Sequence, residues 1–183
     1  VYTLQNHRLS LSSGSLNTPK KPLFHDLLPS LAAKGYYLAY LCAKKRMIYF
    51  SSEDVSFTVP FPIKTRRWLR SVITDRGFTL QQLNYVFCSD EFLLQMNKEY
   101  LNHDYYTDIL TFDSSDEEGI IEGDIFISID RAADNAIQFG VSFESELRRL
   151  LVHGVLHLSG QSDETDEEEA EMRRLEDHYL ATF

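Results

Sequence analysis

Two histidines four residues apart, within the segment 151–163, constrain this chain more than any other feature of its sequence. Residues four apart on a helix project from the same face, so His153 and His157 place two imidazole rings side by side. Gly160 follows three residues later and suits the left-handed conformation that ends a helix. The chain can then turn back and bring Asp163 to the two rings. The segment therefore predicts three ligands for one metal ion at the end of a helix.

The chemistry of these three side chains favours zinc. Two imidazoles and a carboxylate suit Zn²⁺, and three protein ligands leave the fourth tetrahedral position to water. A histidine pair at helical spacing is often only structural, but here it lies in an apolar segment, where unpartnered histidines would be costly to bury. We therefore expect one Zn²⁺ ion bound by His153, His157 and Asp163, with Glu164 as a competitor for the carboxylate position.

Hydrophobic periodicity predicts strands interleaved with helices from Met47 onward. Alternating apolar residues indicate strands, and apolar residues three and four apart indicate helices. Because the two kinds do not alternate strictly, we predict an α+β fold with a small mixed β-sheet flanked by helices. The expected strands are 48–59 (or a bent pair of strands there), 83–88, 108–112 and 120–129, and the expected helices are 63–75, 90–100, 130–139, 142–159 and 165–180.

The first 46 residues differ in composition from the rest. They contain seven basic residues and one acidic residue, a formal net charge of +6, which leaves −16 for the remainder of a chain whose total is −10. The first methionine is Met47. We interpret residues 1–46 as a basic N-terminal extension, non-native or disordered, with a short helical pattern at 31–41, and residues 47–183 as a metal-dependent hydrolase domain. A transit-like targeting peptide is the alternative for the extension.

Apolar runs and cysteines bear on where the protein works. No apolar stretch reaches the length of a membrane span, and no signal-peptide pattern is present. Two cysteines, Cys42 and Cys88, are too few for a disulfide framework and are typical of reduced thiols. We therefore expect a cytoplasmic protein with no membrane partner.

The histidine segment resembles the signature of a known family. The sequence HGVLHLSG at residues 153–160 is similar to the H-G-x-L-H-L-x-G motif of the YbeY family. Two other regions agree in order and spacing, namely MNKEY followed by TDILTF within residues 96–112, and GDIFIS at 123–128. The resemblance covers about residues 47–183. It implies a zinc-dependent, single-strand-specific endoribonuclease acting in rRNA maturation and ribosome quality control. It also implies rRNA and ribosomal particles as partners, with a ribosomal or assembly-factor protein as a further candidate partner.

Two positions depart from the family pattern. Asp163 stands where the family usually has a third histidine, and a carboxylate is still an acceptable zinc ligand. Leu101 stands where the family usually has an arginine, a natural phosphate contact, so the way RNA is held stays open. The acidic domain repels nucleic acid at long range. The candidate cations for this contact are more often solvated surface charges than phosphate ligands. They are Lys98, which is close in sequence, and Arg66, Arg67 and Arg70 of the first predicted helix of the domain.

The catalytic residues beyond the metal ligands are unknown from the sequence. Thr107 and Asp108 precede a predicted strand and are candidates for the general base, although capping or turn formation is their commoner role.

Two other functions compete with RNA cleavage. A zinc peptidase of the extended H-x-x-x-H type needs glutamate directly after the first histidine, and this chain has Gly154 there. A non-enzymatic ribosome-assembly factor stabilised by zinc would need a fourth protein ligand, for which Glu164 and His178 are the candidates.

Overall fold

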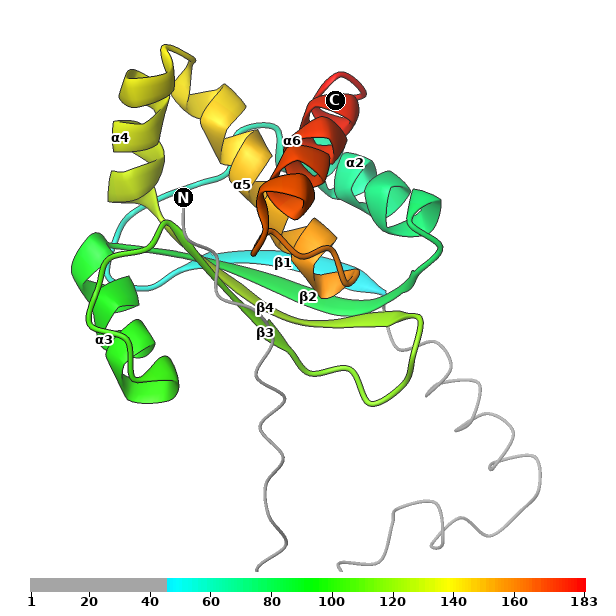
Figure 1. The fold of residues 1–183 in the computed structure, drawn as a ribbon, viewed down its shortest axis with the longest axis horizontal. Helices are drawn as coiled ribbons and strands as arrows, with labels where there is room; N and C mark the ends of the chain where they lie inside the picture. Colours follow the sequence, from blue (N-terminus) through cyan, green and yellow to red (C-terminus); the bar gives the residue numbers. More distant parts are fainter. Residues whose placement is uncertain (1–45) are drawn as a thin grey trace, which may run out of the picture. The chain divides into compact units, whose positions relative to one another are not determined.

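The computed structural model describes residues 46–183, and the predictions for residues 1–45, including the helix at 31–41, lie outside this range. Within it the chain forms four strands and five helices (Figure 1). The strands are β1 (Met47–Ser52), β2 (Thr79–Cys88), β3 (Ile109–Asp113) and β4 (Ile120–Ser128). The helices are α2 (Pro62–Asp75), α3 (Asp90–Leu101), α4 (Ile129–Phe139), α5 (Phe143–Leu158) and α6 (Asp166–Leu180).

The strands form one mixed sheet in the order β1-β2-β4-β3. The pairs β1·β2 and β2·β4 are parallel, whereas β3 runs antiparallel to β4. Parallel neighbours require a crossover connection, and α2 lies in the one between β1 and β2. This mixed sheet with its helices confirms the predicted α+β fold.

Helices lie on both faces of the sheet, but unequally. Successive side chains of a strand point to opposite faces, so β4 sends Ile125 and Ile127 to one side and Phe126 to the other. The first two join the main core, which includes residues of α2, α5 and α6. Phe126 packs instead against a smaller cluster that contains Leu93 of α3. Figure 1 shows the resulting layers, with α5 between α4, α6 and α2 on one face and α3 apart from them.

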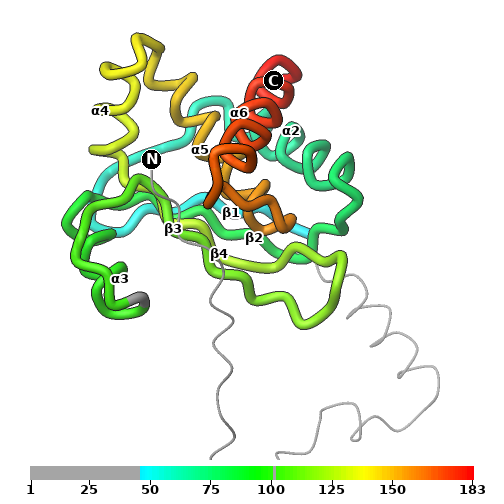
Figure 2. The backbone as a smooth tube through the Cα atoms, in the orientation of Figure 1, coloured from blue at the N-terminus to red at the C-terminus, as the bar shows by residue number. Residues whose placement is uncertain are grey.

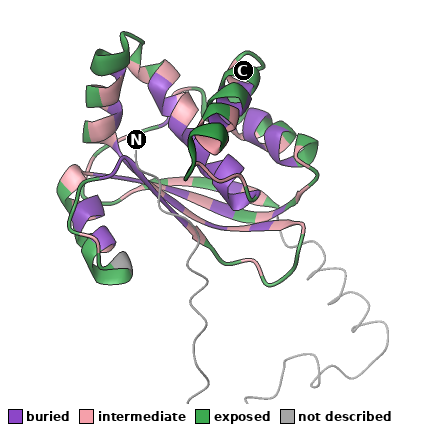
Figure 3. Ribbon diagram, viewed as in Figure 1, coloured by how far each residue is buried: buried purple, intermediate pink, exposed green. Residues whose placement is uncertain are grey.

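Helix α5 is the central helix of the main layer. Eleven of its 16 residues are buried, and they include every residue from 150 to 158, whereas intermediate residues interrupt the first half of the helix (Figure 3). Ser142 caps its first turn by accepting a hydrogen bond from the backbone N–H of Ser145. The chain then returns as α6, which packs along α5 (Figure 2). Such a buried helix can hold polar side chains in fixed positions, because packing leaves them little rotational freedom.

The predicted elements agree with the structure except at two strands. Strand β2 begins at Thr79, four residues before the predicted start at 83, and β1 is shorter than predicted. The strand expected over 48–59 ends at Ser52, because its partner β2 ends at Cys88 and Ser52 already pairs with Phe87. Residues 53–60 leave the sheet, and Ser52 Oγ donates a hydrogen bond to the carbonyl of Phe57. None of the described helices is both long enough and apolar enough to cross a membrane.

Candidate metal centre

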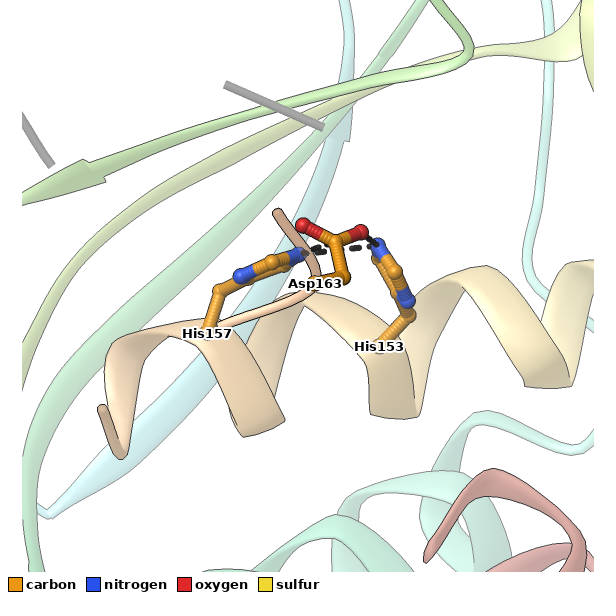
Figure 4. Close-up of side chains that lie close together, drawn as sticks. All are labelled: His153, His157 and Asp163. Atoms are coloured by element: carbon orange, nitrogen blue, oxygen red, sulfur yellow. Dashed lines mark hydrogen bonds and ion pairs between the residues drawn. The ribbon is translucent and has the colours of Figure 1, made fainter. Parts of the chain in front are cut away.

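The three predicted ligands lie together at the C-terminal end of α5 (Figure 4). The Nε2 atoms of His153 and His157 are 2.9 Å apart. Oδ2 of Asp163 lies 3.7 Å from Nε2 of His157 and 3.9 Å from Nε2 of His153. Within residues 46–183 this is the one group of His, Cys, Asp and Glu side chains whose geometry suits a metal ion.

The turn after α5 follows from Gly160. This glycine has φ +86°, and its N–H donates to the carbonyl of His157, while the N–H of Gln161 donates to that of Leu156. These two hydrogen bonds form a Schellman motif, which satisfies the last carbonyls of a helix and reverses the chain. The reversal brings residue 163 back over the helix, as the glycine in the sequence predicted.

The start of α6 fixes the loop that carries Asp163. Thr165 and Glu168 form a reciprocal capping box, with hydrogen bonds of 3.1 and 3.2 Å between side chain and backbone. Oγ of Ser162 also donates to the Glu168 carboxylate, at 2.9 Å. The residues on both sides of Asp163 are thus tied to the first turn of α6, so the carboxylate approaches the imidazoles from a restrained loop.

The donor set fits a small tetrahedral cation. Ligand atoms at about 2.0–2.1 Å from a tetrahedral ion lie about 3.3 Å from one another, and the three observed separations scatter around that value. Both imidazoles are buried, with exposures of 1% and 3%. Burial lowers the pKa of His157; the Asp163 carboxylate opposes this and His153 reinforces it. A neutral imidazole is the form that binds a metal.

A fourth side chain, Glu176 of α6, was not predicted. Its Oε1 lies 2.5 Å from Nδ1 of His153, and both residues are buried. The sequence did carry a signal, because the buried face of α6 consists of Met172, Leu175, Glu176 and Tyr179. A glutamate at an apolar position of a helix indicates a buried partner, but the partner lies 23 residues away.

The two candidates for the general base lie outside the metal triad. Asp108 is buried, accepts a hydrogen bond from Asn135 at 2.9 Å, and lies 3.6 Å from Nη2 of Arg149. Thr107 donates from Oγ1 to the carbonyl of Ile109. Asp108 thus belongs to a cluster around Arg149, one helical turn before His153.

The competing ligands take other positions. Glu164 is exposed, and its N–H donates to Oγ of Ser162. His178 is also exposed, and its ring contacts that of Tyr179. Neither belongs to the metal-binding group found among the described residues.

Some of the basic residues of α2 make contacts within the protein. Nε of Arg66 donates to the carbonyl of Ile48, and its guanidinium lies 4.8 Å from the ring centroid of Phe50. Arg70 contacts Sδ of Met47, whereas Arg67 is exposed. Lys98 forms an exposed ion pair with Asp104. Two of the three α2 arginines therefore hold that helix to β1.

Comparison with known proteins gives the family. The family model described as endoribonuclease YbeY matches residues 52–183. The endoribonuclease YbeY of Cytophaga hutchinsonii is 48% identical over 138 residues, which cover 75% of this chain and 96% of the relative. The protein of the same name from Amoebophilus asiaticus is 43% identical over 136 residues, covering 74% of this chain and 92% of the relative. The chain belongs to the YbeY endoribonuclease family.

A solved structure has a similar fold. The solution structure of TM1509 from Thermotoga maritima matches with a TM-score of 0.55 and 24% identity, over 73% of this chain and 87% of that one. The YbeY match includes α5 and the loop with Asp163, so the predicted triad lies entirely within the family region. The resemblance drawn from the histidine segment is thereby confirmed.

Proposed function

We propose that this chain is a zinc-dependent, single-strand-specific endoribonuclease that acts in rRNA maturation and ribosome quality control. The observation that carries the proposal is the convergence of His153, His157 and Asp163 on one point, in a chain of the YbeY endoribonuclease family. We propose rRNA within ribosomal particles as the substrate and the cytoplasm as the location. The family supports the reaction class, and the donor set supports the metal.

The three side chains would hold Zn²⁺ and leave its fourth position for water or substrate. When bound, zinc supplies an acidified water or a polarised phosphoryl oxygen for hydrolysis of the RNA backbone. His153 and His157 contribute neutral nitrogen ligands, and Asp163 offsets one charge of the cation. Because α5 is packed on both sides, the two rings need little rearrangement to bind.

A zinc peptidase is disfavoured by the position that follows the first histidine. Peptidases with this spacing use a glutamate there as general base. Gly154 is buried, and a side chain in its place would meet Ile125 and Ile109 of the sheet, away from solvent. A glutamate could therefore not act at this position, even if substitution introduced one.

A purely structural zinc is disfavoured by the number of ligands. Closed structural sites usually have four protein ligands. Only three side chains converge here among residues 46–183, and both candidates for a fourth, Glu164 and His178, are exposed. An open position is what a catalytic site requires.

The deciding experiment compares the zinc-loaded chain with its His157→Ala variant. We expect the parent to cleave a single-stranded RNA, free or within ribosomal subunits, and to leave a duplex of the same sequence intact. The variant should lose zinc and activity together. His178→Ala is the matched control, because it removes an exposed histidine outside the triad, and it should behave like the parent. Equal cleavage by the His157 variant, or a zinc-loaded parent that cleaves neither form of RNA, would contradict the proposal.

A further inference from the structure

His153 is held from both of its ring nitrogens. Nε2 faces His157 and Asp163, while Nδ1 contacts Oε1 of Glu176 at 2.5 Å. Glu176 comes from α6, so the contact joins two helices that pack against each other.

The contact selects one form of the imidazole. An ionised carboxylate can only accept hydrogen bonds, so the hydrogen between the two groups belongs to Nδ1 of His153. In a neutral ring the other nitrogen, Nε2, then carries the lone pair, and it faces the place where the ligand atoms converge. The hydrogen bond also fixes the rotation of the ring about its bond to Cβ. Both effects prepare His153 to bind a cation.

Glu176 is itself restrained on its other side. Arg149, one turn before His153 on α5, forms two hydrogen bonds with the carboxylate of Glu146, at 2.9 and 2.6 Å. With its guanidinium fixed in this way, Nη1 of Arg149 lies 3.4 Å from Oε1 of Glu176. All three side chains are at most 16% exposed. The carboxylate therefore cannot turn away from His153 without losing a second charged partner.

A role in folding alone accounts poorly for this residue. The neighbours of Glu176 on the buried face of α6 are apolar, and an apolar side chain there would avoid burying a charge. Arg149 already has a bidentate partner in Glu146 and does not require a second carboxylate. What Glu176 contacts in addition is the metal-facing histidine.

We propose that Glu176 is a positioning residue, which holds His153 in the tautomer and orientation that bind the metal ion. This inference rests on the proposed zinc site and adds to it a partner from α6. In other proteins, removing a hydrogen-bond partner of this type from a metal-binding histidine lowers metal affinity by about 10- to 100-fold. The metal centre is then built by α5, the following loop and α6 together.

The first test measures zinc affinity by competition with a chelator, in four variants of the full chain. Glu176→Gln keeps a hydrogen-bond acceptor but loses the charge, and Glu176→Leu loses both, so we expect affinity to fall in that order, by about 10- to 100-fold. Glu146→Gln is the buried control, since Glu146 contacts Arg149 and not His153. Glu171→Gln is the surface control on α6. Both controls should retain more zinc affinity than either Glu176 variant.

The second test needs no metal. Nitrogen chemical shifts of the His153 ring, measured by NMR on the metal-free chain, report which nitrogen carries the hydrogen. We expect Nδ1–H in the parent and in Glu171→Gln, and a mixture of tautomers in Glu176→Leu. The Glu176 variants must first show a cooperative unfolding transition, so that loss of fold is not mistaken for loss of positioning.

The outcomes separate this inference from the zinc proposal. Folded Glu176 variants with parental zinc affinity and an unchanged His153 tautomer would overturn the positioning role. If the parent chain binds no zinc at all, the proposed function fails, and the tautomer measurement alone then decides whether Glu176 controls His153.

Discussion

A Cβ atom placed on Gly154 of α5 would lie 2.7 Å from Cδ1 and 3.0 Å from Cγ2 of Ile125 in β4. Real Cβ atoms almost never come this close, so the glycine sets how near α5 lies to the sheet. The same glycine directly follows His153. Close packing of the helix and the position of the first proposed ligand are therefore coupled through one residue.

Gly154→Ala should destabilise the domain, although alanine favours helices. Overpacking typically costs about 1–3 kcal/mol, against a gain of about 1 kcal/mol in helix propensity. We expect a net loss of about 1 kcal/mol in urea unfolding. Ile125→Val removes Cδ1, the nearest clashing atom, so the double variant should be more stable than the sum of the two single effects predicts. Strict additivity would show that this contact does not limit the packing.

The histidine segment was predictable because its geometry is local. Helical spacing places His153 beside His157, and a glycine in the left-handed region turns the chain toward Asp163, all within eleven residues. Glu176 could not be assigned from the sequence, because its partner depends on how α6 packs on α5. The strand expected over 48–59 was too long for a similar reason, since a partner strand, and not local periodicity, decides where β1 ends.

Asp163→Ala should lower zinc affinity at least tenfold, because it removes a side chain proposed to bind the ion directly. Removing a residue that only hydrogen-bonds to a metal ligand already costs about 10- to 100-fold in affinity. Glu164→Ala is the matched control, because the adjacent carboxylate is exposed and outside the triad. Asp163→His, which replaces one common zinc ligand with another, should retain zinc. Undiminished zinc in Asp163→Ala would show that this carboxylate is not a ligand.

Residues 1–46 should be dispensable for the stability of the domain. Strand β1 begins at Met47, and the main core is formed by residues from Ile48 onward. A chain beginning at Met47 should therefore unfold at the same temperature as the full chain. A melting temperature lower by several degrees would indicate that the N-terminal segment contributes to folding.

Cys88 should be unreactive in the folded protein. Burial, reinforced by nearby acidic residues, raises its pKa to about 12, so at pH 8 the thiolate fraction is about a thousandfold below that of an unfolded cysteine. A Cys42→Ser variant leaves this one thiol to measure. It should react slowly with a disulfide reagent at pH 8 and rapidly after urea is added. Fast reaction in the absence of denaturant would contradict the burial of Cys88.

The same pKa has a consequence for stability. A folded-state pKa above the unfolded value of about 8.5 means that the folded state keeps its proton where the unfolded state loses it. The contribution to stability is present below about pH 8.5 and is lost as the pH rises toward 12. The Cys42→Ser chain should therefore lose more stability between pH 8 and 10 than the same chain with Cys88→Ala.

Intrinsic RNA binding should be weak and only slightly dependent on salt. Residues 47–183 carry a formal net charge of −16, and Arg66 and Arg70 are engaged with β1. We expect about two to four phosphate contacts, which for a single strand corresponds to a slope of about −1.5 to −3 in log affinity against log salt. Cleavage would then depend on a ribosomal particle or partner protein that presents the RNA, since positioning can replace missing binding energy.

The alternative to weak binding is that the three arginines of α2 together bind the RNA phosphates strongly, as an arginine track. A salt titration of binding to a single-stranded oligonucleotide distinguishes the two. The track requires a steep slope that disappears when Arg66, Arg67 and Arg70 are changed to alanine, and such a result would overturn the weak-binding prediction. Because two of these arginines hold β1, the triple variant must first be shown to be folded, and Arg67→Ala alone tests the exposed member. Arg173 and Arg174, which pair with glutamates on α6, supply the matched control. A shallow slope, with cleavage restored by adding ribosomal subunits, is the result we expect, because a domain with a formal net charge of −16 attracts free RNA only weakly.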